Sequence, residues 1–323
     1  MIKMQIVSLI LASIGAIWTL SFTWKVLRFI NIYFIRTSSI SKYNHNHVHS
    51  SQTPWAIVTG ASNGIGKAYA YELCRKNFNI VLHGRNATKL HHYRTELHDE
   101  FPHLSFRVIV ADASKTGPAA IQKIKEIVDS LKDLHVTVLI NNVGTGDKRD
   151  GTCYSQVQDT EAEDIDHLIS LNAQFPAQFT RAVVPLLLSH GGPALILTMG
   201  SMSDFGMPYL TVYSASKAFD MSFSRGLRRE MLAEGRNVEV LGIMTGEITG
   251  ASGVESPSSL LKPHAKDYAR AALDRVGCGE DVVAGCWAQG IVWAVVSSIP
   301  LSLLDNALTD GIRKDMIRRA KMA

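Results

Sequence analysis

Hydrophobic and polar positions divide the chain into parts with different periods. From Gln5 to Trp24 no residue is charged and most side chains are apolar. A helix needs about 20 such residues to cross the hydrocarbon core of a bilayer. The pattern predicts an N-terminal membrane anchor with a basic flank at residues 1–42. A cleaved signal peptide is the alternative, but its apolar core is usually shorter and no small-x-small cleavage site follows here.

Charges around the apolar segment are unequal. Only Lys3 precedes the segment, and four basic residues follow it: Lys25, Arg28, Arg36 and Lys42. By the positive-inside rule, the rest of the chain should face the cytosol. Residues 43–53 are polar and rich in Ser and Asn, which predicts a linker. Its alternating histidines are more consistent with a solvated surface than with a metal site: His45, His47 and His49.

After Pro54 short β-branched runs alternate with longer amphipathic ones. The expected strands are "WAIVTG", "NIVLHG", "SFRVIVAD", "VTVLINN", "ALILTM" and "VEVLGIM". The expected helices lie near residues 66–76, 88–100, 119–131, 163–188 and 212–233. This repeated order predicts an α/β fold, a Rossmann-type doubly wound parallel sheet with helices on both faces. Because no break in the pattern interrupts residues 54–279, we expect a single domain there.

A second uncharged run, Val282 to Leu304, begins the C-terminal segment 280–323. It is long enough to span a membrane, yet its polar or helix-breaking residues include Gln289, Ser297, Ser298 and Pro300. If it crossed, the basic tail from Arg313 would be lumenal, against the positive-inside rule. A helix at the membrane interface, with its two tryptophans, is therefore favoured. A core helix of the domain is the alternative.

Composition limits the partners. The 323 residues are 46% hydrophobic with a net charge of +4, which describes a globular protein. Basic residues are spread out except near the C-terminus, so nucleic acid is not predicted as a partner. The four cysteines form no Cys-x-x-Cys pair, so neither a disulfide framework nor a metal site is indicated.

A glycine-rich turn, "TGASNGIGKAYAYEL", follows the first expected strand. Missing side chains there let backbone amides and the positive end of a helix approach a pyrophosphate. The turn therefore predicts dinucleotide binding. The expected cofactor-binding residues in it are Gly60, Ser62, Asn63, Gly64, Ile65 and Gly66.

The end of the second expected strand, "LHGRN", bears on the choice of dinucleotide. An acidic residue at this place would bind the ribose 2′-hydroxyl of NAD, and none is present. Arg85 is placed to pair with a 2′-phosphate instead. NADP(H) is therefore the expected cofactor. The alternative for Arg85 is a solvated charge at the start of a helix.

Three motifs together, T-G-x-x-x-G-x-G, "NNVG" and Y-x-x-x-K, resemble the short-chain dehydrogenase/reductase family from Pro54 onward. The tyrosine and lysine of the last motif are Tyr213 and Lys217, one helical turn apart on one face. The ammonium group can therefore stabilise the ionised phenol, so that the tyrosine exchanges a proton with a substrate. The resemblance also places both residues beside the cofactor, with Lys217 reaching the nicotinamide ribose.

The resemblance implies further catalytic roles. Ser201 would hold the substrate carbonyl oxygen by a hydrogen bond. Ser203 is its rival, because Ser201 stands twelve residues before Tyr213 where the family more often has thirteen. Asn172 would support a water that connects the lysine to solvent. The alternative for Asn172 is an amide that packs a helix kink.

The same resemblance assigns cofactor contacts outside the glycine turn. Asp112 would contact the adenine, and Asn141 with Gly144 would form the floor of the adenosine pocket. Gly246 would lie beside the nicotinamide carboxamide. Thr245 stands where the family usually has proline, which leaves the local backbone restraint in question.

The anchor, "INNVG", "KDYARAALDRVG" and "GCWAQGIVWAVVSSIP" together resemble a membrane-bound branch of the family. This branch contains microsomal very-long-chain 3-oxoacyl-CoA reductases and 17β-hydroxysteroid dehydrogenases of types 3 and 12. The resemblance implies NADPH-dependent reduction of a lipophilic ketone, most simply a long-chain 3-oxoacyl-CoA in fatty-acid elongation. A steroid or specialised-metabolite ketone is the alternative. It also implies an endoplasmic reticulum membrane protein with a cytosolic catalytic domain.

Three further expectations concern motion, assembly and turnover. Loop Gly250–Lys262 is either a lid over the substrate or an ordinary connection. The long helices around Asn172 and Tyr213 pack across dimer interfaces in relatives, so a homodimer is one expected arrangement. A non-catalytic NADP(H)-binding membrane protein is the other class of function. The intact Ser201, Tyr213 and Lys217 argue against it.

Overall fold

The protein is described by a computed structural model that covers residues 2–45, 53–251 and 257–320. Seven parallel strands form one sheet in the order β3-β2-β1-β4-β5-β6-β7. The strands are β1 (Trp55–Thr59), β2 (Asn79–Gly84), β3 (Phe106–Val110), β4 (Val136–Asn141), β5 (Ala194–Met199), β6 (Val238–Met244) and β7 (Val282–Ala284). The chain order reverses between β1 and β4, which opens a crevice beyond the carboxyl ends of these strands.

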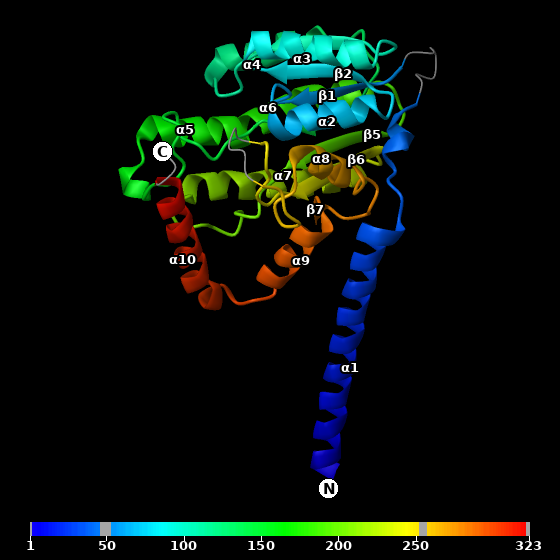
Figure 1. Ribbon diagram of the computed structural model, residues 1–323. Coiled ribbons are helices and arrows are strands. Elements are labelled where there is room, and N and C mark those ends of the chain that lie inside the picture. Colours follow the sequence, from blue (N-terminus) through cyan, green and yellow to red (C-terminus); the bar gives the residue numbers. More distant parts are fainter. Residues whose placement is uncertain (1, 46–52, 252–256, 321–323) are drawn as a thin grey trace.

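Helices cover both faces of the sheet (Figure 1). The α-helices are α1 (Ile2–Ile30), α2 (Gly64–Cys74), α3 (Ala87–Glu100), α4 (Gly117–Asp129), α5 (Ala162–Ile169), α6 (Phe175–Leu188), α7 (Thr211–Ala233), α8 (Ala265–Leu273), α9 (Trp287–Val296) and α10 (Leu301–Ala320). Short π and 3₁₀ turns are η1 (Asn31–Ile35), η2 (Ile40–Tyr43), η3 (Val157–Asp159) and η4 (Ser170–Gln174). The predicted doubly wound α/β fold is confirmed.

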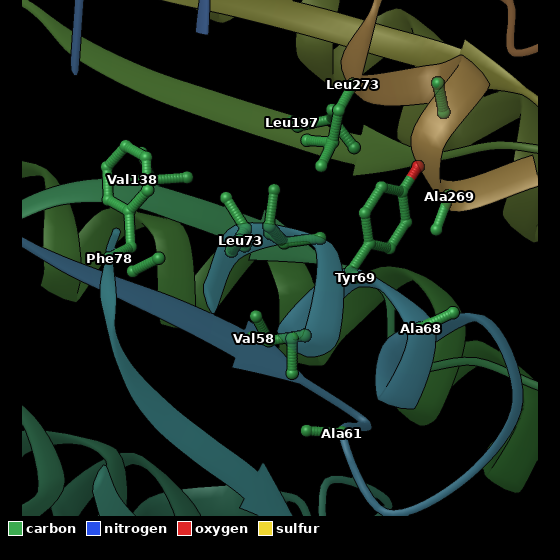
Figure 2. Packing of buried hydrophobic residues seen from close by; sticks show 14 of the residues in the cluster. Val58, Ala61, Ala68, Tyr69, Leu73, Phe78, Val138, Leu197, Ala269 and Leu273 are labelled. Carbon is green, nitrogen blue, oxygen red and sulfur yellow. The ribbon is translucent and has the colours of Figure 1, made fainter. Parts of the chain in front are cut away.

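Successive side chains of a strand point to opposite faces of the sheet, so the strands contribute to two separate hydrophobic cores. One core joins the sheet to α2, α3 and α8, and the other joins it to α4, α6 and α7. Figure 2 shows the first core, where Tyr69 of α2 rises from the helix toward Ala269 of α8. Its hydroxyl reaches the sulfur of Met199 at 3.2 Å. This packing fixes α2, and with it the glycine turn, against the sheet.

The sheet continues beyond residue 279, where the sequence pattern placed the end of the domain. Strand β7 pairs with β6 and is fully buried. The uncharged run 282–304 is therefore a strand followed by two helices and the turn that joins them, rather than one continuous helix. Helix α9 has 10 residues and is about 15 Å long, too short to cross a bilayer core of about 30 Å.

Helix α1 extends away from the domain as a rod (Figure 1). Among the described residues, segment 3–35 is the one helical stretch long and apolar enough to cross a membrane, and its most apolar 18-residue window has mean hydropathy 1.9 and no buried residue. Three of its hydroxyl groups donate to carbonyls within the helix, as Ser13 does to the Leu9 carbonyl at 2.9 Å. Such internal pairing suits a helix in lipid, where water cannot satisfy polar groups.

The segment after α1 is docked on the domain. The Arg36 guanidinium donates to the carbonyls of Asp274 and Val276 at 2.9 and 2.7 Å. Tyr43 is fully buried and its hydroxyl donates to Glu239. Residues 43–45, assigned to a linker by their polar composition, thus belong to the packed base of the domain. Residues 46–52, with His47 and His49, lie outside the described part.

Candidate active site

The glycine turn after β1 has the backbone that its sequence requires. Gly60 and Gly64 adopt φ values of 67° and 56°, which side chains disfavour. A Cβ on Gly66 would lie 2.2 Å from the Gly60 carbonyl oxygen, so no larger residue fits there. Asn63 precedes α2 and accepts from the Gly64 amide at 2.9 Å. This cradle, at the N-terminus of an 11-residue helix, suits a pyrophosphate.

Asn142 braces this turn and was not selected from the sequence. Its side-chain Nδ2 donates to the Thr59 carbonyl at 3.0 Å, and its backbone amide donates to the Thr59 hydroxyl at 2.9 Å. The neighbouring Asn141 points into the core, where its side chain is 3% exposed and donates to Thr180 at 2.7 Å. Alternation along β4 explains the difference, because successive side chains leave on opposite faces. The alternation of side chains along the strand, continued through "NNVG", could have identified Asn142 as the asparagine on the side of the glycine turn.

The ends of β2 and β3 form a corner for the adenosine half of a dinucleotide. Arg85 is exposed directly after β2, and a Cβ on Gly84 would lie 3.5 Å from the Ser62 hydroxyl. Asp112, just beyond β3, accepts from the Ser114 amide and hydroxyl at 3.0 and 2.8 Å. Burial opposes ionisation of Asp112, but these hydrogen bonds and the charges of Lys115 and Arg85 hold its pKa below the usual value. Arg85 and Asp112 therefore share this corner.

Loop Gly250–Lys262 approaches the glycine turn. A Cβ on Gly64 would lie 2.5 Å from the Ala251 carbonyl oxygen, so the start of the loop touches the turn. Its other described end is held by Lys262, whose ammonium pairs with Glu247. Residues 252–256, in the centre of the expected lid, lie outside the described part.

Tyr213 and Lys217 lie in the first two turns of α7, beside the loop after β4. The Lys217 Nζ donates to the Met199 carbonyl and to Asp220 Oδ2, both at 3.0 Å. A Cβ on Gly144 would lie 3.1 Å from Nζ, which explains why a glycine stands there. A Cβ on Gly146 would lie 3.8 Å from the Tyr213 ring. The lysine, the tyrosine and this loop thus meet at the carboxyl edge of the sheet.

Asn172 lies in the π turn η4 between α5 and α6. Its Oδ1 accepts from the Thr145 amide at 2.9 Å, and its Nδ2 donates to the Thr145 carbonyl at 2.8 Å. The side chain thus braces the loop that faces Lys217. A π turn also disturbs the regular pairing of backbone carbonyls, a feature common at functional sites.

A hydrogen bond joins the two candidate serines. The Ser203 hydroxyl donates to the Ser201 Oγ at 2.9 Å, and Ser203 is 7% exposed, whereas Ser201 is half-buried. Ser203 is therefore oriented to support Ser201. Gly200 keeps the backbone close to α7, because a Cβ there would lie 2.7 Å from the Met221 sulfur.

The loop after β6 is restrained without the usual proline. The Tyr268 hydroxyl lies 2.9 Å from the Thr245 hydroxyl and 3.1 Å from the Met244 carbonyl. The Gln289 Oε1 accepts from the Gly246 amide at 2.9 Å. Gln289 is 2% exposed and comes from α9. Sequence reasoning missed both Tyr268 and Gln289, because nothing near them in the chain indicates contact with this loop.

A family model described as short chain dehydrogenase matches residues 54–258. The chain belongs to the short-chain dehydrogenase family. Among its relatives, a very-long-chain 3-oxoacyl-CoA reductase of Pyricularia oryzae is 31% identical over 98% of this chain and 93% of the relative. The reductase of that name from Coccidioides immitis is 29% identical over 97% and 89% of the two chains.

Solved structures of the short-chain dehydrogenase family share the fold. A bulky-bulky ketone specific alcohol dehydrogenase from Comamonas testosteroni aligns with a TM-score of 0.63 and 23% identity, covering 79% of this chain and 94% of that one. A short-chain dehydrogenase from Sphingobium yanoikuyae in complex with NADPH aligns with a TM-score of 0.59 and 24% identity, covering 82% and 95%. The family expected from the three sequence motifs is thus confirmed.

Proposed function

We propose that this short-chain dehydrogenase reduces a long-chain 3-oxoacyl-CoA to the 3-hydroxyacyl-CoA with NADPH. The observation that carries the proposal is the meeting of Tyr213, Lys217 and the Gly144 loop beside a glycine turn shaped for a dinucleotide. The substrate class is supported by the names of relatives that cover nearly the whole chain. NADP(H) is supported by Arg85, by the missing acid after β2 and by relatives solved with that cofactor.

Four side chains have separate roles in the proposed reduction. The glycine turn after β1 would hold NADPH, which would supply a hydride to the carbonyl carbon when bound. Ser201 donates a hydrogen bond to the carbonyl oxygen and stabilises the charge that develops there. Tyr213 gives its proton to that oxygen, and the Lys217 ammonium stabilises the phenolate that remains. Asn172 keeps the Thr145 backbone in place beside the lysine.

A place at the membrane follows from α1 and from the apolar surface beside it. Helix α9 exposes an apolar face, and the Trp287 ring lies 6.0 Å from the Phe34 ring at the end of the anchor. We propose that α1 spans the endoplasmic reticulum membrane with the catalytic domain in the cytosol, and that α9 touches the bilayer surface. The anchored site would meet acyl chains where they concentrate.

A homodimer is the proposed assembly. Phe219 of α7 is 44% exposed and stacks on Phe223 with ring centroids 5.9 Å apart. An aromatic pair with one exposed ring, on the helix that carries Tyr213, suits a two-fold contact with a second copy. Size-exclusion chromatography in detergent with light scattering tests it. A purely monomeric protein would remove this assembly from the proposal.

The decisive experiment compares substrates in membranes that contain the full chain. NADPH oxidation is followed with a long-chain 3-oxoacyl-CoA and with a 17-ketosteroid, for the protein and for Tyr213→Phe. We expect turnover of the acyl-CoA that the variant loses by about a thousandfold, with NADPH still bound. Turnover of the steroid alone would replace the substrate class. NADPH binding without turnover of either ketone would favour a specialised ketone or the non-catalytic alternative.

A further inference from the structure

A buried carboxylate lies next to the lysine of the proposed site. Asp220 follows Lys217 by three residues on α7, so the two side chains share one face of the helix. Asp220 is 2% exposed and Lys217 is 5% exposed. Their charged groups are 3.0 Å apart. The second oxygen of Asp220, Oδ1, is buried without a hydrogen-bond partner among the described residues.

The proposed reaction assigns no step to this carboxylate. Tyr213 moves the proton, Ser201 holds the oxygen, and Lys217 supplies positive charge. Burying a carboxylate with one unpaired oxygen costs free energy that an apolar side chain would not. An ammonium group has three hydrogens to donate. The Met199 carbonyl and the Asp220 carboxylate accept hydrogen bonds from two of these hydrogens. The third can be donated toward Tyr213 and the place where a cofactor would bind.

We propose that Asp220 is a positioning residue that pins the Lys217 ammonium against β5 and partly cancels its charge, and so sets the pH range in which Tyr213 exchanges its proton. The inference rests on the proposed reductase site. A negative charge beside the ammonium weakens the attraction of the ammonium for a phenolate. The carboxylate therefore keeps Tyr213 protonated, and able to reduce a ketone, to a higher pH.

The surroundings of the pair contain few other charges. Among the described residues, the groups that act electrostatically on Lys217 are Asp220 and Tyr213, and the group that acts on Asp220 is Lys217. Strand β5 contributes the neutral Met199 carbonyl, and the neutral amide of Asn172 in η4 lies near Lys217 at Gly144, where a Cβ would meet both side chains. In the described parts of α5, α6, β6 and β7, no further charged group contributes to the pKa shift of either member of the pair.

The protonation of the pair agrees with this role. Burial raises the pKa of Asp220 to about 6, although the Lys217 charge opposes the shift. Burial disfavours the charged lysine, but Asp220 and Tyr213 outweigh it and hold the pKa of Lys217 above its usual value. As the pH falls and Asp220 takes up a proton, the pair therefore gains one positive charge. The lysine acts on Tyr213 and on an anionic cofactor with its full charge only on the acid side.

The test uses the full-length protein and Asp220→Asn, which keeps the size of the side chain and removes its charge. We expect the alkaline limb of kcat for ketone reduction to move to lower pH by about one unit. We also expect the ratio of NADPH dissociation constants at pH 7.5 and pH 5.5, measured by fluorescence, to fall severalfold below that of the unsubstituted protein. Asp220→Ser provides a second neutral variant if Asp220→Asn does not fold.

Glu72→Gln is the matched control. Glu72 is 3% exposed and pairs with Arg75 and Arg270, so the substitution also removes a buried carboxylate from its cations. Glu72→Gln should lower the free energy of unfolding. It should leave unchanged the alkaline limb of kcat and the ratio of NADPH dissociation constants at the two pH values. If the alkaline limb of folded Asp220→Asn stays in place or moves to higher pH, or if the NADPH ratio is unchanged, the inference is overturned. Failure of the proposed function itself would appear separately, as full activity of Tyr213→Phe.

Discussion

Arg85 is the single residue that most directly sets the proposed cofactor preference. It is exposed after β2, near Ser62 and Asp112, where a 2′-phosphate would lie. Arg85→Asp should weaken NADPH binding by about 10- to 100-fold and leave NADH binding nearly unchanged, because it removes a charge-assisted hydrogen bond and adds repulsion. Fluorescence titration with both dinucleotides measures the ratio. Arg94→Asp makes the same charge change on the exposed side of α3 and should not alter it.

His83 is a second residue with a measurable consequence. Its ring is fully buried, stacks on Phe175 with centroids 5.2 Å apart, and has no hydrogen-bond partner among the described residues. Burial lowers the pKa of His83 to about 4. Between this value and the ordinary 6.5 the unfolded chain binds the extra proton, so stability is lost as pH falls through that window.

The linkage predicts the effect of His83→Phe. The unsubstituted protein should lose about 2 kcal/mol of unfolding free energy from this group between pH 7 and pH 5. The variant, which packs a ring of similar size, should lose correspondingly less. Denaturant unfolding of the full chain in detergent at the two pH values measures the difference. An equal loss in both proteins would show that His83 does not titrate in this window.

At the scale of elements, the loop after β6 is held by two distant helices. The Gln289 amide of α9 bonds to Gly246, Glu247 and Leu261, at 2.9 to 3.2 Å. Gln289→Met fills the same space but leaves a donor and two acceptors without their partner. We expect a loss of about 1–3 kcal/mol in stability and weaker NADPH binding. Gln122→Met on the exposed side of α4 is the control. NADPH affinity equal to that of the control would refute the role.

The same loop shows why the sequence predicts elements better than contacts. Periods of 2 and 3.6 located six strands and five helical segments, because each pattern is local. Strand β7 was missed because its three residues lie inside a longer uncharged run. Tyr43 and Gln289 were missed because their partners are about 200 and 40 residues away. The family motifs located Tyr213 and Lys217, but the carboxylate of Asp220 became meaningful only through its distance to the lysine.

At the scale of the whole molecule, α1, α9 and the start of α10 lie on the same side of the domain (Figure 1). Apolar side chains are exposed there, with Val295 at 52% and Leu303 at 71%. If this side rests on the bilayer that holds α1, a charge on it should be costly only in the membrane. Val295→Asp should then leave folding and the turnover of a short, water-soluble 3-oxoacyl thioester unchanged.

The same variant separates membrane contact from anchoring. With α1 as the proposed anchor, Val295→Asp should raise the KM for a long-chain 3-oxoacyl-CoA severalfold in proteoliposomes and have little effect in detergent. Leu232→Asp, at a side chain 62% exposed on α7, adds the same charge away from α9 and should change neither value. An identical KM for the protein and both variants in proteoliposomes would mean that α1 alone brings this enzyme to its substrate, with the α9 face turned to water.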